Sequence, residues 1–155
     1  MKKFATLLLV ILLCVTLLAL VSCGDKTKKL AENEVRITVG GSDFIAKLSD
    51  TKAAKELKKA LPMTLEMRML NAGTVLYTDL GSSEFTEQPD SSAPMSKGDI
   101  ILRGNNRLEI YCGFAQPESV TRIGSIREQD VDAFVAAVQA LRDSGNSTTT
   151  VKISK

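Results

Sequence analysis

Residues 35–48 read VRITVGGSDFIAKL, and this stretch decides the fold. Apolar and polar residues alternate on both sides of Gly40-Gly41, which is the pattern of two half-buried strands. A Gly-Gly pair tolerates the positive φ angles that a two-residue hairpin turn requires. The stretch therefore predicts a β-hairpin with one face in a core and the other in water.

Further elements follow the hairpin without an internal repeat. Helical spacing of apolar residues predicts a helix from Ala53 to Leu61 that Pro62 ends, and a second helix over 130–144. The segment 78–97 is rich in Gly, Ser and Pro, so we expect a long surface loop there. Alternating or β-branched stretches predict further strands at 64–69, 75–77, 99–102, 108–114, 120–126 and 148–153.

This order of elements favours one architecture over units of strand, helix and parallel strand. Seven or eight short strands with two amphipathic helices predict a mainly β fold, a closed antiparallel barrel whose open ends the helices cover. Few aromatic residues follow the amino-terminal leader, so the core is expected to consist mainly of Leu, Ile, Val and Met.

Several phrases of the sequence resemble a known family. The segment AAKELKKALPMTLEM at 53–67 is similar to the passage from helix to third strand in bacterial cyclophilin-like fold proteins. KGDIIL at 97–102, LEIY at 108–111 and TRIGSI at 121–126 resemble later phrases of the same family. The resemblance implies a cyclophilin-type barrel of about eight strands with two helices, and it implies little about chemistry.

The amino-terminal leader has the layout of a bacterial export signal. Lys2 and Lys3 precede an apolar run, and the sequence LVSC at 20–23 resembles the lipobox of bacterial lipoproteins. In that reading the Cys23 thiol receives diacylglycerol as a thioether, and the chain is cut after Ser22. We therefore expect a signal peptide over 1–22, a lipidated Cys and flexible tether over 23–34, and a cyclophilin-like domain over 35–155.

This organisation predicts a protein on the extracytoplasmic side of the cell membrane, held there by its lipid. An uncleaved membrane helix and ordinary secretion are the two alternatives, because the apolar run is about as long as a minimal membrane span. The polar tether carries Lys26, Lys28 and Lys29 close to the lipid, where they either attract an anionic surface or act as a solvated spacer.

Composition excludes several classes of function. The chain of 155 residues contains no His, so neither Ser-His-Asp catalysis nor a His-ligated metal site is expected. Lys2 and Lys3 account for the excess of 20 basic over 18 acidic residues, which leaves the remainder formally neutral. A neutral domain argues against nucleic acid as a partner. We expect no cofactor and no metal.

Cysteine usage predicts no disulfide within the mature chain. Cys14 leaves with the leader and Cys23 carries the lipid, so that Cys112 remains alone. Cys112 alternates with apolar residues that include Leu108, Ile110 and Phe114, and we interpret it as a buried, inert thiol.

No catalytic residue is assigned from the sequence. Prolyl isomerases of the cyclophilin type use an Arg beside an apolar proline pocket, but the Phe-His-Arg phrase of that family is absent here. Arg68, Arg103, Arg107 and Arg122 meet only the requirement for residue type. Glu66, Arg68 and Glu109 are interpreted as cross-strand pairs on a solvated sheet face.

A binding module is the preferred interpretation of the domain. Arg103, Tyr111 and Arg122 are polar-tipped residues of barrel strands, and a peptide or small molecule could lie across the wall that they share. The alternative for these residues is that their stems merely cover the outside of the barrel. Two other functions stay open, a peptidyl-prolyl isomerase and a structural envelope lipoprotein.

Overall fold

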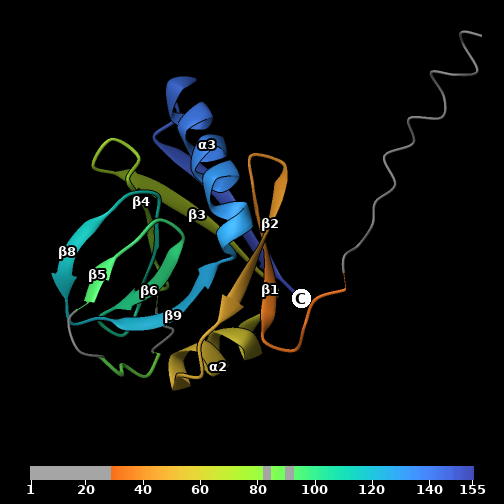
Figure 1. Cartoon of the computed structure of the whole chain (residues 1–155), viewed down its shortest axis with the longest axis vertical. Helices are drawn as coiled ribbons and strands as arrows, with labels where there is room; N and C mark the ends of the chain where they lie inside the picture. The colour runs from red at the N-terminus through yellow and green to blue at the C-terminus, as the bar shows by residue number, and fades with distance from the viewer. Residues whose placement is uncertain (1–28, 82–84, 90–92) are drawn as a thin grey trace, which may run out of the picture.

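The computed structural model describes residues 29–81, 85–89 and 93–155. The expected signal peptide, Cys23 and most of the expected tether lie outside these residues. Within the described chain, eight strands close an antiparallel barrel (Figure 1). Their order around the barrel is β1 (Glu34–Val39), β10 (Thr148–Ser154), β3 (Met63–Leu70), β4 (Val75–Asp79), β7 (Arg107–Tyr111), β6 (Asp99–Arg103), β9 (Thr121–Ile126) and β2 (Ser42–Leu48).

The hairpin at the start of the domain is confirmed. Val39 pairs with Ser42 across a turn in which Gly40 and Gly41 have φ angles of 57° and 79°. These angles lie in the left-handed region, which glycine adopts without the steric cost of a Cβ atom. The alternation of residues is thereby fixed, and Phe44, Ala46 and Leu48 all point into the barrel.

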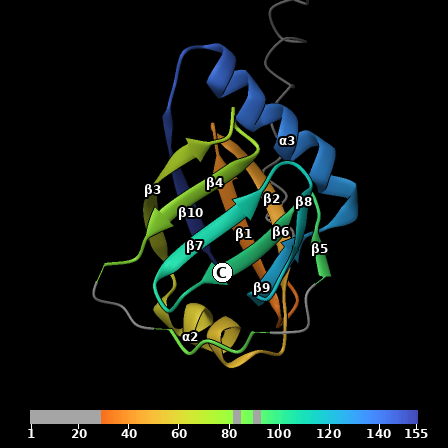
Figure 2. The ribbon, with the colours of Figure 1, turned by 90° about the vertical axis from the view of Figure 1, so that its left-hand side faces the viewer.

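Two helices lie at opposite ends of the barrel in both ribbon views, as the sequence predicts (Figures 1 and 2). Helix α2 (Lys52–Ala60) begins where the Thr51 hydroxyl accepts a hydrogen bond from the Ala54 amide at 3.2 Å. Helix α3 (Glu128–Asp143) covers the other end. Its Phe134 meets Phe44 edge to face, with ring centroids 5.4 Å apart.

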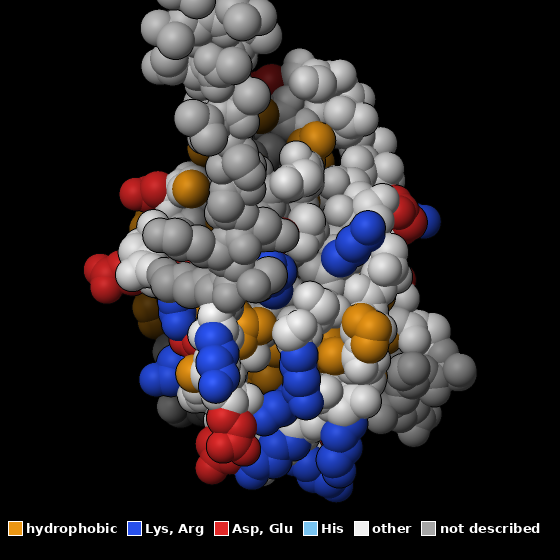
Figure 3. Space-filling view, turned by 90° about the vertical axis from the view of Figure 1, so that its right-hand side faces the viewer, with side chains coloured by type: hydrophobic (Ala, Val, Ile, Leu, Met, Phe, Trp, Pro, Cys, Tyr) orange, Lys and Arg blue, Asp and Glu red, His pale blue; other side chains and the backbone are white. Residues whose placement is uncertain are grey.

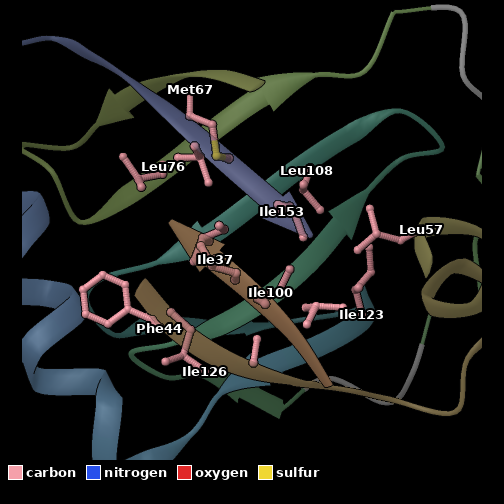
Figure 4. Close-up of a cluster of buried hydrophobic side chains, with 14 of the residues drawn as sticks. Ile37, Phe44, Leu57, Met67, Leu76, Ile100, Leu108, Ile123, Ile126 and Ile153 are labelled. Atoms are coloured by element: carbon pink, nitrogen blue, oxygen red, sulfur yellow. The ribbon is translucent and has the colours of Figure 1, made fainter. Parts of the chain in front are cut away.

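Aliphatic side chains from the barrel strands and from α2 fill the interior (Figure 4). Apart from Phe44, Phe85 and Phe134 it consists of aliphatic and sulfur-containing residues, as the composition predicts. Every barrel strand and both helices lie between Glu34 and Ser154. This part of the chain therefore contains a complete core and can be studied without the leader. Fully buried members of the core include Ile37, Leu57, Met67, Leu76, Ile100, Leu108, Ile110 and Ile123.

A second, smaller core lies outside the barrel wall. A two-stranded ribbon of β5 (Ala93–Met95) and β8 (Ala115–Glu118) lies over the outer face of the wall (Figures 1 and 2). The ribbon covers part of the outward face of β6 and β7, which explains why Ile101 on that face is as buried as its neighbours. The side chains of this second core are Val75, Met95, Ile101, Tyr111 and Val120.

The ribbon corrects two sequence-based expectations. The segment 78–97 is not a surface loop throughout, because it contains β5, and both Met95 and Phe85 are buried. The strand expected at 108–114 ends at Tyr111, and the chain then leaves the barrel wall. Phe114 therefore does not join Cys112 in the core but has 77% of its surface exposed.

The described residues form no helix that is both long and apolar enough to span a membrane.

Candidate functional site

A hollow of about 290 Å³ opens on the outer wall of the barrel, beside the β5–β8 ribbon. We call it the outer-wall hollow. It is made by the ends of β3 and β4, the outward faces of β6 and β7, and the segment that leads into β8. Its lining residues are Leu70, Asn71, Thr74, Val75, Arg103, Arg107, Glu109, Tyr111, Phe114, Ala115 and Glu118.

A buried carboxylate forms the floor of the outer-wall hollow. Glu109 is only 3% exposed, and its Oε1 accepts a hydrogen bond from Arg103 Nε at 3.0 Å. The Tyr111 hydroxyl donates to Glu109 Oε2 at 3.1 Å. A buried carboxylate is stable only when it is paired and hydrogen-bonded, and these contacts meet that requirement.

Arg103 connects the floor of the hollow to its rim. Its Nη2 donates to the Tyr111 hydroxyl at 3.2 Å, and its Nη1 donates to the half-exposed carboxylate of Glu118 on β8. Burial lowers the pKa of the Arg103 guanidinium, but the hydrogen bonds that it donates to Glu109 and Glu118 outweigh this effect, and the net shift is upward. Arg103 therefore stays charged and holds the ribbon against the barrel.

Tyr111 stands in a low-dielectric position next to a negative charge. Burial raises the pKa of its phenol, and the nearby Glu109 carboxylate raises it further because a phenolate would be repelled there. The hydrogen bond from Arg103 opposes this shift without cancelling it. The hydroxyl is thus kept as a donor at neutral pH.

The raised pKa of Tyr111 leads to a testable alkaline titration. We expect a tyrosinate absorbance step at 295 nm above the usual value of about 10, absent from Tyr111→Phe. Because the folded-state pKa lies above the unfolded one, the neutral phenol contributes its full stability below the unfolded pKa. That contribution is lost as the pH rises through the folded pKa. If Tyr111→Phe leaves the late step unchanged, the environment described for this phenol is wrong.

The hollow also has an apolar rim. Leu70 at the end of β3 is 38% exposed and Phe114 is 77% exposed. Among the described residues these two are the large hydrophobic side chains that remain exposed, and both line this one hollow. Large apolar side chains left open beside converging polar groups are typical of ligand sites.

The structure brings together two of the four residues that the sequence nominates. Arg103 and Tyr111 are in contact within the hollow, whereas Arg122 is not among its lining residues. The Arg122 guanidinium donates to Asp99 Oδ2 at 2.8 Å and to the carbonyl oxygen of Pro94 at 3.2 Å. Arg122 therefore holds β5 to the barrel, while Cys23, the fourth nominated residue, lies outside the described chain.

Sequence reasoning missed the central position of Glu109. Glu109 does pair with Arg103 across strands, and also with Arg107 on its own strand, but the interpretation as a solvated face is wrong for Glu109, because this carboxylate is buried beside the ribbon. The alternation of Arg107, Glu109 and Tyr111 with Leu108 and Ile110 was the available signal for a polar outward face. Nothing local to Glu109 indicated the ribbon.

The described part of the chain offers neither a reactive thiol nor a metal site. The expectation of a buried Cys112 is confirmed, and burial raises the pKa of its thiol to about 12, which keeps it protonated and unreactive. Among residues 29–81, 85–89 and 93–155, no cluster of three acidic, Cys or His side chains is placed to hold a metal ion.

Comparisons with known proteins agree with the barrel. A model of the cyclophilin-like family matches residues 37–154. No curated protein sequence matches the chain. A solved structure titled "Structure of McbB in complex with tryptophan" aligns with a TM-score of 0.59 at 19% identity, covering 78% of this chain and 44% of that one. The chain thus spans less than half of that protein, and the likeness shows the fold alone.

Proposed function

Because this chain belongs to the cyclophilin-like family, we propose that it is a ligand-binding member, held to the extracytoplasmic face of a membrane by a lipid on Cys23. The ligand, a peptide end or a small molecule, occupies the outer-wall hollow and is bound without being converted. The observation that carries this proposal is the exposed apolar rim beside the Arg103–Glu109–Tyr111 network.

The chemistry of the hollow favours binding over catalysis. Glu109 is already paired with Arg103 and lies below the surface, so a ligand does not reach it directly. Tyr111 is held protonated and its oxygen is committed to two hydrogen bonds. These groups are rigid and mutually satisfied, which suits the orientation of a bound molecule.

The lipid anchor is supported by the leader and by basic side chains near the amino-terminal part of the domain. Lys29 follows Cys23 by six residues, a distance that an extended chain spans in about 20–22 Å. It lines a surface depression with Arg36, Lys58 and Lys155, which outnumber the two glutamates, Glu32 and Glu34, in the same lining. Figure 3 shows Lys and Arg side chains gathered at the lower end of this side of the molecule. Each basic residue close to an anionic bilayer adds about 1 kcal/mol of attraction.

The anchor is tested by the mass of protein extracted from membranes. We expect loss of residues 1–22 and addition of acyl chains, and we expect Cys23→Ser to accumulate as the unprocessed precursor. Cys14→Ser, within the leader, is the matched control and should be processed normally. A wild-type protein with an unmodified Cys23 would contradict the anchor.

The binding function is tested on the unlipidated chain that begins at Gly24, which contains the complete core. Tryptophan is a suitable first probe, because the chain contains no Trp and the indole fluorescence excited at 295 nm then belongs to the probe alone. The solved structure of McbB, which aligns with this chain, was also determined in complex with tryptophan. Phe114→Ala should weaken binding at least fivefold.

Phe114→Ala should leave the thermal midpoint of unfolding almost unchanged, because a mostly exposed side chain contributes little to the core. The control is Gln116→Ala. Gln116 is exposed and does not line the hollow, whereas Ala115, which is closer to Phe114 in the chain, does. Equal binding by wild type, Phe114→Ala and Gln116→Ala would place the ligand elsewhere and contradict the proposal.

A further inference from the structure

The outer-wall hollow contains a second arginine whose bonding differs from that of Arg103. All three guanidinium nitrogens of Arg103 donate hydrogen bonds to Glu109, Tyr111 or Glu118. The Nε atom of Arg107, by contrast, is buried and lies 3.2 Å from Glu109 Oε1. It forms an ion pair with that oxygen but no hydrogen bond. No residue of the described chain accepts a hydrogen bond from the two terminal nitrogens of Arg107.

Arg107 is nevertheless held firmly in place. Its guanidinium carbon lies 4.1 Å from the centroid of the Tyr77 ring, which is a cation–π contact between β7 and the neighbouring strand β4. The ring contacts one face of the guanidinium, and the charge of Glu109 attracts its Nε edge. The side chain is still 31% exposed and lines the hollow. It is thus positioned, charged and open to a ligand.

The two arginines and two glutamates that line the hollow cancel in formal charge, so it is the open hydrogen-bonding capacity of Arg107, and not net charge, that favours an anion. Two guanidinium groups share the single buried carboxylate of Glu109, and the second acidic residue, Glu118, bonds to Arg103 at the rim. Asp79 lies across from Arg107 in the strand pairing but forms no ion pair with it within the described structure.

We propose that the ligand carries a carboxylate, bound side-on by the two terminal nitrogens of Arg107, and an apolar body that packs against Leu70 and Phe114. This inference rests on the proposed binding function and names the class of ligand. A guanidinium binds a carboxylate through two parallel hydrogen bonds, a geometry that gives both strength and orientation. The hollow of about 290 Å³ accommodates one side chain with its carboxylate.

The same chemistry is offered by a free amino acid and by the carboxyl terminus of a peptide. The two differ at the α-nitrogen. It is a charged ammonium in a free amino acid and an uncharged amide nitrogen at the end of a peptide. The probes are therefore tryptophan, N-acetyltryptophan and N-acetyltryptophan amide, each followed by its own fluorescence with the chain that begins at Gly24. The amide matches N-acetyltryptophan in shape but carries no negative charge.

We expect N-acetyltryptophan to bind at least tenfold more tightly than its amide. Arg107→Gln should remove that difference by weakening only the acid, while Arg68→Gln, on the exposed face of β3, should leave it intact. Arg107→Lys, which keeps the charge but loses the planar fork, should retain only part of the preference. Preference for free tryptophan over N-acetyltryptophan indicates an amino acid ligand, and the reverse indicates a peptide end.

Equal binding of acid and amide by the wild type would overturn the carboxylate inference and leave the binding function intact. An acid preference that survives Arg107→Gln would overturn the assignment to Arg107. Failure of all three probes to bind at millimolar concentration would overturn the proposed binding function itself, and the inference with it.

Discussion

Replacing Gly124 by alanine is expected to destabilise the barrel by about 3 kcal/mol and to lower its thermal midpoint by roughly 10 °C. A Cβ atom at this position would lie 2.3 Å from the carbonyl oxygen of Lys47 and 3.0 Å from the Cα atom of Leu48. Both are backbone atoms, so no side chain can rotate away. The β2–β9 pairing, which closes the barrel, has to separate.

Ser125→Ala is the matched control, since Ser125 follows Gly124 on the same strand and is exposed. It should change the free energy of unfolding by less than about 0.5 kcal/mol. The measurement is urea unfolding followed by circular dichroism. A Gly124→Ala variant as stable as Ser125→Ala would mean that β2 and β9 do not approach as closely as described.

Glu109→Gln is expected to cost about 3 kcal/mol of folding stability. The amide keeps the shape of the side chain but removes the negative charge that faces Arg103 and Arg107. The guanidinium groups of Arg103 and Arg107 then lie close together without the carboxylate that they share. We place the cost at the lower end of the range for buried pairs because both arginines are partly exposed and water can reach them.

Glu118→Gln offers a sharp comparison, because Glu118 contacts the same Arg103 from a half-exposed position. An exposed ion pair is worth about 0–1 kcal/mol, so this variant should unfold close to wild type. Equal stability of Glu109→Gln and Glu118→Gln would contradict the buried position of Glu109 in the floor of the hollow. Burial is the property that distinguishes these two carboxylates.

Local sequence patterns predicted most of the barrel. The hairpin around Gly40-Gly41, the helix before Pro62 and the helix that ends near Gly145 all depend on interactions between near neighbours in the chain. Such patterns are readable because a strand repeats every two residues and a helix every 3.6. The order of the elements predicted a closed sheet and the family resemblance agreed with it; the strand pairing confirms the closure, and the family match confirms the resemblance.

The ribbon was not predictable for a physical reason. Strands β5 and β8 are short, β8 contains Pro117, and they pair with each other across many intervening residues. A pairing of this kind depends on what lies beneath it, and here that is the outward face of β6 and β7. Missing the ribbon led directly to the wrong expectation for Phe114 and to the solvated interpretation of Glu109.

The candidate residues also differ in whether the sequence could predict their contacts. Arg103 and Tyr111 meet because they belong to adjacent strands of one hairpin, a relation that the sequence contains. The position of Arg122 depends on a register irregularity between β6 and β9, which carries its side chain toward Asp99 and Pro94. An irregularity in pairing is a property of the assembled sheet and leaves no local signature.

Amide chemical shifts of the ¹⁵N-labelled chain from Gly24 onward, recorded as N-acetyltryptophan is added, test the binding site most directly. The shifts are expected to concentrate on β7, on the end of β6 and on the segment from Phe114 to Glu118. Shifts confined instead to the basic depression around Lys58, or spread evenly over the domain, would contradict a ligand site on the outer wall.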